Sequence, residues 1–297
     1  MKGIEVAESV LQVKAWQKGA IRAPHKSLLI LYALGKFIAG QKKISFAEAE
    51  EDLRNLLCDF GPPRRINRPE YPFWRLQNDK VWMVTVSLPV EENRAGDVGR
   101  RVLIDADARG SFSKVVLNAL NKEPALVKFL IKELLANNFP ETIHEDILQA
   151  IGIDLEELSK GTGLQIRCSK FRDKILRAYE YRCAVCGFDV RIGHTPIALE
   201  AAHIKWHQAG GPDAEENGLA LCTLHHKLFD RGAFTLSRDM EVCVSDKANG
   251  HYGFAECLMQ YHGDRIRFPQ STRYSPDFKY VSWHTNEVFQ GNKRDLS

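Results

Sequence analysis

Two short pairs of metal-binding residue types bracket one segment of the chain, and a metal ion joining them would fix its fold. Cys183 and Cys186 form a C-x-x-C pair, and Cys222 and His225 form a C-x-x-H pair. Two residues between ligands let a tight turn direct both side chains to one ion, and two such turns complete the tetrahedron of a structural zinc site. A redox-active C-x-x-C pair would not need the second pair. The sequence therefore predicts a structural Zn²⁺ held by these four side chains.

A second set of polar residues lies inside and just beyond this bracket. The residues ALEAAHI form an apolar strand pattern around His203, and a glycine-rich stretch, QAGGPDAEENG, follows. The next stretch, LALCTLHHKLFD, is predicted to begin a helix on which His226 and Asp230, four positions apart, share one face. His203 alone could be a buried structural histidine, but its place between a strand and a loop favours a functional one. We expect a strand–loop–helix unit with zinc at one end and an available histidine and a second ion at the other.

Residues 181–234 resemble the HNH nucleases, whose ββα-metal motif carries a histidine, an asparagine and a second histidine in the same order. The resemblance implies that His203 is the general base and that Asn217 braces the loop behind it. It also implies that His226 and Asp230 hold one Mg²⁺ or Mn²⁺. Phosphodiester hydrolysis needs a base for the attacking water and a cation for the scissile phosphate, and histidine is neutral at about pH 7.

One position departs from the HNH pattern. Many relatives carry a metal-binding Asp or His immediately before the base, whereas this chain has Ala202. Glu200 is then a weaker candidate ligand, and the exact ligand set stays open.

The segment from Gly61 to Arg75 is the second informative one, because arginines alternate there with flat side chains. The arginines are Arg64, Arg65, Arg68 and Arg75, and the flat side chains are Tyr71, Pro72, Phe73 and Trp74. Guanidinium groups neutralise phosphates, while flat side chains pack on sugars or bases. Phe73 and Trp74 could instead be strand residues of the core, and the arginines a solvated face. We favour a phosphate site, to which a glycine-broken loop adds Arg94, Arg100, Arg101 and Arg109.

The phrases RAPHKSLLILYAL and RPEYPFWRLQNDKVW resemble the sulfur-binding domain of phosphorothioate-dependent, type IV-like restriction endonucleases, which join such a domain to an HNH nuclease. The resemblance covers roughly residues 1–155. It implies an apolar pocket at Tyr71 and Pro72 for the sulfur, with His25 and Lys26 at the phosphorothioate and Arg75 beside them. Moving a polarisable, weakly hydrated sulfur into an apolar pocket costs little free energy, whereas an oxygen moved there loses its bound water without gaining new hydrogen bonds. The surrounding DNA backbone would be held by Arg64, Arg65, Arg94, Arg100 and Arg101.

We therefore expect an α+β chain of two domains. An N-terminal DNA-reading domain of mixed helices and strands is predicted at 1–155, a linker at 156–170, and a zinc-stapled ββα-metal (HNH) nuclease domain at 171–297. Helices are predicted over 5–17, from Pro24 to Gly40, over 46–60 and within 111–150, and a hairpin turn at Asn78-Asp79 between two strands. The apolar run Leu28–Leu34 places the second of these helices in the core.

Composition limits where this protein acts. The net charge of +3 is too small to indicate nucleic-acid binding by itself, so DNA contacts must come from local clusters. The longest apolar run, Leu28–Leu34, is too short to span a bilayer, and the N-terminus lacks a signal-peptide pattern. Four further cysteines are predicted to be free thiols, which suits a reducing cytoplasm: Cys58, Cys168, Cys243 and Cys257.

The sequence as a whole predicts a modification-dependent endonuclease that acts on double-stranded, phosphorothioate-modified DNA and has no membrane partner. Two alternatives stay open. The reader could instead bind a modified base, for which Trp74 and Tyr71 would supply part of an aromatic cage. The protein could also only bind DNA, with a degenerate zinc module, as Ala202 would favour. The DNA sequence context, the cleavage distance, the catalytic metal, and the choice between monomer and homodimer are not determined by the sequence.

Overall fold

The computed structural model describes residues 3–13, 16–18, 21–153 and 169–295, and the chain divides into two compact units, Met1–Thr162 and Gly163–Ser297. Each unit mixes helices with strands, so the predicted α+β fold class is confirmed. The predicted linker at 156–170 lies outside the described residues except for its last two positions, and Cys168 lies outside them too. No helix in the described ranges has the length and hydropathy that crossing a membrane requires.

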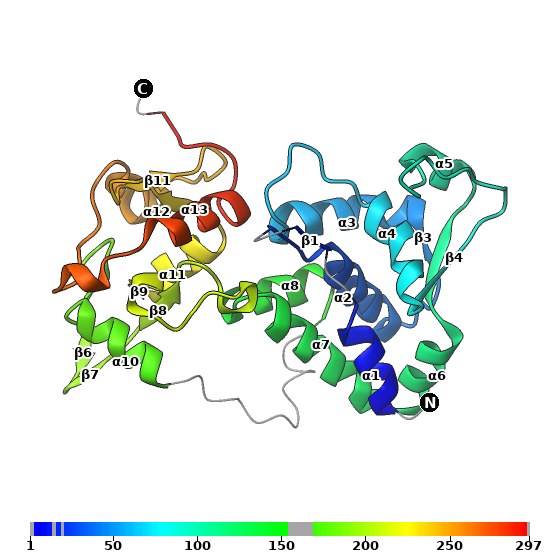
Figure 1. Ribbon diagram of the computed structural model, residues 1–297, viewed down its shortest axis with the longest axis horizontal. Coiled ribbons are helices and arrows are strands. Elements are labelled where there is room, and N and C mark those ends of the chain that lie inside the picture. The colour runs from blue at the N-terminus through cyan, green and yellow to red at the C-terminus, as the bar shows by residue number, and fades with distance from the viewer. Residues whose placement is uncertain (1–2, 14–15, 19–20, 154–168, 296–297) are drawn as a thin grey trace. The chain divides into compact units, whose positions relative to one another are not determined.

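The N-terminal unit is built around α2 (His25–Ile38), on which every residue from Ser27 to Gly35 is buried. This apolar run was predicted to lie in the core, and its burial confirms that prediction. Helices α3 (Phe46–Phe60), α4 (Glu70–Arg75) and α7 (Pro124–Asn138) pack against α2 (Figure 1). Further helices described in this unit are α1 (Gly3–Leu11), α5 (Arg100–Asp105), α6 (Lys114–Lys122) and α8 (His144–Ala150), with 3₁₀ helices η1 (Leu76–Asp79) and η2 (Glu141–Ile143).

A small antiparallel sheet in the order β3–β5–β4 holds α4 in place. Its strands are β3 (Ile44–Ser45), β4 (Trp82–Thr85) and β5 (Arg109–Phe112). The ring of Phe73 on α4 lies 5.0 Å from that of Phe46 and 5.7 Å from that of Trp82, between centroids. The Trp82 indole N–H also donates to the Phe73 carbonyl at 3.1 Å. Buried aromatic packing thus fixes the short helix that carries Tyr71 and Pro72.

Two predictions in this unit are wrong. The helix expected over 5–17 ends at Leu11, and β1 (Trp16–Lys18) pairs with β2 (Ile21–Ala23) instead. Strand pairing outweighs the weak helical periodicity of that stretch. No hairpin turn lies at Asn78-Asp79, because residues 70–79 are helical and bury Phe73 and Leu76 at helical spacing. The chain reverses at Lys80, whose φ is 61°.

The C-terminal unit contains a strand–strand–helix arrangement. Strand β8 (Leu199–His203) pairs antiparallel with β9 (Gly218–Cys222), from Leu199 opposite Cys222 to His203 opposite Gly218, and α11 (Thr223–Asp230) follows at once. The prediction that LALC begins the helix is wrong: all five residues of β9 are buried, and a short, wholly apolar run of this kind forms a buried strand. Further elements are α10 (Ser169–Ala178), β6 (Arg191–Ile192), β7 (Thr195–Pro196), β10 (Phe234–Leu236), β11 (Val242–Val244), α12 (Tyr252–Cys257) and α13 (Phe278–Glu287), with 3₁₀ helices η3 (His207–Ala209), η4 (Glu215–Asn217), η5 (Met259–Tyr261) and η6 (Thr272–Tyr274).

Gly110 on β5 is required for the packing of α4 on the sheet. A Cβ at this position would lie 2.8 Å from the Phe73 ring and closer still to Trp82. We expect Gly110→Val to destabilise the chain by about 1–3 kcal/mol through overpacking, measured as a lower midpoint of thermal unfolding. Gly99→Ala is the control, because a Cβ there meets no atom within 4 Å. Equal midpoints for the two variants would show that this packing does not fix α4.

Candidate functional site

Four metal-binding side chains meet where β9 joins α11. Cys183, Cys186, Cys222 and His225 offer donor atoms that all lie within 4.8 Å of one another. His225 directs Nδ1 to the Cys222 sulfur at 3.1 Å, while its Nε2 lies 2.9 Å from the Cys257 carbonyl. A ring whose Nε2–H donates to a carbonyl presents a bare Nδ1, the form that binds a metal. The donor set and its outer hydrogen bond therefore fit one tetrahedral ion.

The charges of this cluster also favour a cation. Hydrogen bonds from Cys186 and Cys222 hold the pKa of Cys183 far below its ordinary value, which makes it a thiolate. Burial alone would lower the pKa of His225, but the sulfurs of Cys183 and Cys186 outweigh burial and raise it to about 10, so a metal ion would displace a proton from Nδ1 when it binds. A buried group of sulfurs that gathers negative charge is a setting in which a divalent ion is strongly favoured.

Asn217 braces the loop that follows His203. Its side chain is fully buried, and its amide oxygen accepts from the Lys205 backbone N–H at 2.8 Å. The amide nitrogen donates to the carbonyls of Lys205 and Pro212, both at 3.0 Å. Gly211 is needed in the same loop, because a Cβ there would collide with the Lys205 carbonyl. These contacts span the loop, as the role implied for Asn217 requires.

His203 is held between a ring and a carboxylate. Its imidazole stacks on Phe171 of α10, with centroids 4.0 Å apart and planes 10° apart, and its Nε2 lies 2.8 Å from Asp213 Oδ1. An Nε2–H that donates to Asp213 leaves Nδ1 as the basic nitrogen. Sequence reasoning missed both partners. Asp213 had a signal, an acidic residue in the glycine-rich loop, but Phe171 looked like an ordinary helix residue.

His226 lies between two carboxylates, with its side chain only 4% exposed. Its Nδ1 is 2.6 Å from Glu200 Oε2, and its Nε2 is 3.2 Å from Asp230 Oδ2. Burial would lower the pKa of His226, but Asp230 and then Glu200 outweigh it and raise the pKa to about 9. Asp230 is buried and accepts from the Trp206 indole N–H at 3.1 Å, whereas the side chain of Glu200 is 37% exposed. Ala202, the residue before the base, is fully buried.

In the N-terminal unit, the start of α2 and helix α4 form what we call the α2–α4 corner: His25, Lys26, Tyr71 and Pro72. The Nε2 atom of His25 is buried and has no hydrogen-bond partner among the described residues. Burial, and secondarily the Arg64 guanidinium, lower the pKa of His25 to about 4, so its ring is neutral near pH 7. Lys26 pairs with Asp79 at 2.5 Å.

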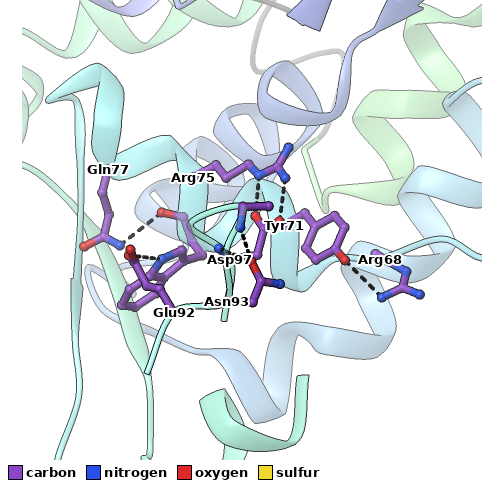
Figure 2. Close-up of polar contacts among 9 residues, drawn as sticks. Arg68, Tyr71, Arg75, Gln77, Glu92, Asn93 and Asp97 are labelled. Atoms are coloured by element: carbon purple, nitrogen blue, oxygen red, sulfur yellow. Dashed lines mark hydrogen bonds and ion pairs between the residues drawn. The ribbon is translucent and has the colours of Figure 1, made fainter. Parts of the chain in front are cut away.

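Tyr71 lies between two guanidinium groups (Figure 2). Arg68 and Arg75 lie 5.3 and 5.0 Å from its ring centroid, and Arg68 Nη1 donates to the Tyr71 hydroxyl at 3.0 Å. Tyr71 is half-buried and Pro72 is buried, so Tyr71 offers more of the accessible surface. The indole N–H of Trp74 donates to Glu92 at 2.9 Å. The polar atoms of Tyr71 and Trp74 thus both have hydrogen-bond partners within the protein.

The predicted phosphate-binding cations fall into two groups. Arg75 pairs with buried Asp97, Arg100 pairs with buried Glu50 at 2.6 Å, and Arg101 lies 3.8 Å from Asp105 on the surface. Within the described residues, no ion pair joins Arg64, Arg65 or Arg94 to a carboxylate. Arg68 has no carboxylate partner among the described residues either and donates to the Tyr71 hydroxyl instead. The charges of these arginines are therefore not compensated by an ion pair, and the charge of Arg64 lies close enough to His25 to lower its pKa.

Two family matches cover most of the chain. Residues 4–156, more than half of the 297-residue chain, match the family of the ScoMcrA-like, DNA sulfur-binding domain. Residues 183–237 match the HNH endonuclease family. No curated protein matches the chain.

Solved structures resemble the N-terminal half more loosely. The sulfur binding domain of ScoMcrA complexed with phosphorothioated DNA is 20% identical, covering 51% of this chain and 96% of that one, with a TM-score of 0.44. The sulfur binding domain of SprMcrA complexed with phosphorothioated DNA is 18% identical, covering 52% and 95%, with a TM-score of 0.43. The type IV phosphorothioation-dependent restriction endonuclease ScoMcrA is 21% identical, covering 52% of this chain and 33% of its own, with a TM-score of 0.43. These TM-scores are too low to classify the chain, so its classification rests on the two family matches.

The Cys/His cluster predicts a metal-dependent C-terminal unit. Cys222→Ser should release the bound ion and unfold this unit, because ligation supplies much of a small module's stability. Cys257→Ser is the control, since its side chain lies in the same unit but outside the cluster. Metal content by mass spectrometry and protease resistance of residues 169–295 measure the two effects. A Cys222→Ser variant that stays folded without metal would contradict a structural role for the ion.

Proposed function

The chain belongs to the family of the ScoMcrA-like DNA sulfur-binding domain and carries an HNH endonuclease domain, and from this we propose that it cuts DNA that contains phosphorothioate linkages. The α2–α4 corner reads the sulfur, and the ββα arrangement hydrolyses a phosphodiester bond. The observation that supports this most is the corner itself, where a buried His25 nitrogen has no partner among the described residues and the uncompensated charge of Arg64 lies nearby.

Reading relies on the difference between sulfur and oxygen. The edge of Tyr71, beside Pro72, offers sulfur an apolar surface at little cost, while an oxygen placed there loses water without a replacement. Neutral His25 can donate its N–H to the remaining phosphorothioate oxygen, which would satisfy a buried nitrogen that lacks a partner. Arg64, Arg65 and Arg94 neutralise neighbouring phosphates whatever their chemistry. Selectivity and affinity thus come from different side chains.

Cutting relies on His203. Its Nδ1 accepts a proton from the attacking water, while Asp213 fixes the tautomer and stabilises the imidazolium that forms. Phe171 keeps the ring in plane, and Asn217 holds the loop. Glu200 and His203 are three positions apart on β8, so their Cα atoms are about 10 Å apart along the strand.

The more exposed side of His226 is where we place the catalytic ion. Mg²⁺ or Mn²⁺ bound there would stabilise charge on the scissile phosphate and on the leaving oxygen. His226 Nδ1 and Glu200 would hold it, because Glu200 is accessible. Asp230 is buried and bonded to Trp206, so it orients His226 through Nε2. A separate Zn²⁺ on the Cys/His cluster would be structural.

Free thiols at Cys58, Cys243 and Cys257 support the cytoplasm as the place of action.

Binding titrations test the reading step. We expect the chain without added Mg²⁺ or Mn²⁺ to bind a phosphorothioate duplex about 10- to 100-fold more tightly than its unmodified twin. Tyr71→Ala should shrink this ratio, because it removes the apolar contact. Arg64→Ala should weaken both duplexes about equally and should lower the salt dependence of both. A wild-type chain with no preference for sulfur at either of two salt concentrations would overturn the phosphorothioate assignment and favour a modified base.

Variants of the histidine site test the cutting step. His203→Ala should slow cleavage by about 10²- to 10⁴-fold and leave duplex affinity unchanged, because the base acts only in the reaction. Asp213→Asn should slow cleavage by about 10- to 100-fold. His207→Ala is the control: this exposed ring lies 5.9 Å from that of His203, and among the described residues no hydrogen bond or ring contact joins it to Asp213 or Phe171. Loss of DNA binding in His203→Ala would indicate a structural histidine instead.

A further inference from the structure

A buried ion pair ties the loop after β4 to helix α4 (Figure 2). Two nitrogens of Arg75 donate to the two carboxylate oxygens of Asp97, and the bond from Nη2 measures 2.6 Å. The Asp97 side chain is 4% exposed and that of Arg75 is 40% exposed. A bidentate pair fixes orientation as well as distance, and a carboxylate this buried depends on its partner. The contact uses the guanidinium edge that a phosphate would need.

Asp97 closes a tight turn whose apex is Arg94. The side-chain oxygen of Asn93 accepts from the backbone N–H groups of Ala95 at 2.8 Å and of Asp97 at 3.1 Å. The backbone of Asn93 also donates to the Asp97 carbonyl at 2.8 Å and accepts from Gly96 at 2.9 Å. Arg94 and Ala95, both exposed, are the central residues of this turn. The turn is therefore ordered by its own hydrogen bonds, as an Asx turn is.

The turn is fastened beside the α2–α4 corner. Arg75 is bonded to Asp97 and also lies 5.0 Å from the Tyr71 ring centroid. Glu92, next to the turn, accepts from Trp74 at 2.9 Å and provides a second tie to α4. Three residues of extended chain cover at most about 10 Å, so Arg94 cannot lie farther than that from Asp97 along the backbone. Exposed Arg94 is thus carried on a short turn whose two sides, at Glu92 and Asp97, are each bonded to α4.

We propose that Asp97 and Arg75 form a latch that positions Arg94 against DNA at the α2–α4 corner. Arg75 is then a positioning residue and not a phosphate contact. The inference rests on the proposed function, because it assigns a task within DNA reading. A latch and a direct phosphate contact by Arg75 predict opposite changes in DNA affinity when the charge of Asp97 is removed. If Arg75 bound phosphate, removing the charge of Asp97 would free a cation and strengthen DNA binding. If the pair is a latch, the same change weakens binding.

The test measures duplex affinity of the full chain at two salt concentrations, for the phosphorothioate duplex and for its unmodified twin. Asp97→Asn should weaken binding of both about 5- to 10-fold and lower the salt slope by about 1, since one phosphate contact is lost. Asp105→Asn is the matched control. It makes the same change of charge and frees exposed Arg101, so it should strengthen binding slightly. Stronger binding by Asp97→Asn as well would overturn the latch.

A second variant separates the latch from a folding defect. Asn93→Ala leaves the buried pair intact but removes the two side-chain hydrogen bonds inside the turn, and it should weaken binding in the same direction with an unchanged melting temperature. In an Arg94→Ala background, Asp97→Asn should change affinity by less than about twofold, because both act through one contact. Additive losses would overturn the inference. The latch can be tested with the unmodified duplex alone, so its test does not depend on a preference for sulfur. A chain that binds both duplexes equally well would overturn only the proposed function. A chain that bound neither duplex would overturn both.

Discussion

The junction of β9 and α11 is the point on which the C-terminal unit depends. Cys222 ends the strand and His225 lies in the first turn of the helix, so an ion that binds both fixes the angle between them. His226 follows the ligand His225 directly, and Asn217 precedes β9. Strand β8 is paired along β9, so its register places Glu200 and His203 as well. An ion held by these four side chains would thus fix the position of the residues that we propose for hydrolysis.

The N-terminal unit divides its charged residues between structure and recognition. Buried Glu50 and Asp97 hold Arg100 and Arg75, and a buried carboxylate without such a partner would be costly. Arg64, Arg65 and Arg94 make no such pair among the described residues, and they stay available to phosphates. Apolar packing through Phe73 fixes α4 beneath them. A small net charge is therefore compatible with DNA binding, because binding can rely on local groups of uncompensated arginines such as Arg64 and Arg65.

Features with a local signature could be predicted from the sequence. The C-x-x-C and C-x-x-H spacing predicted the metal cluster, and the apolar run from Leu28 to Leu34 predicted a buried helix, since each rests on neighbouring residues. Partners far apart in the chain could not be predicted: Asp97 for Arg75, Asp79 for Lys26 and Phe171 for His203 meet only after folding. Short apolar runs were ambiguous between strand and helix, and this is why β9 and the segment before Lys80 were misassigned. Whether an arginine is available to bind a phosphate or is held in an ion pair within the protein depends on these distant partners.

Cleavage of matched duplexes tests the central claim, that sulfur read at the α2–α4 corner directs hydrolysis at His203. The full chain is incubated with a duplex that carries a phosphorothioate linkage and with its unmodified twin, each with Mg²⁺ or Mn²⁺, and the products are separated on a gel. The account predicts strand cleavage of the modified duplex and little or none of its twin, and no cleavage of either by His203→Ala. Equal cleavage of the two duplexes, or a modified duplex that is bound but never cut with either metal, would contradict it.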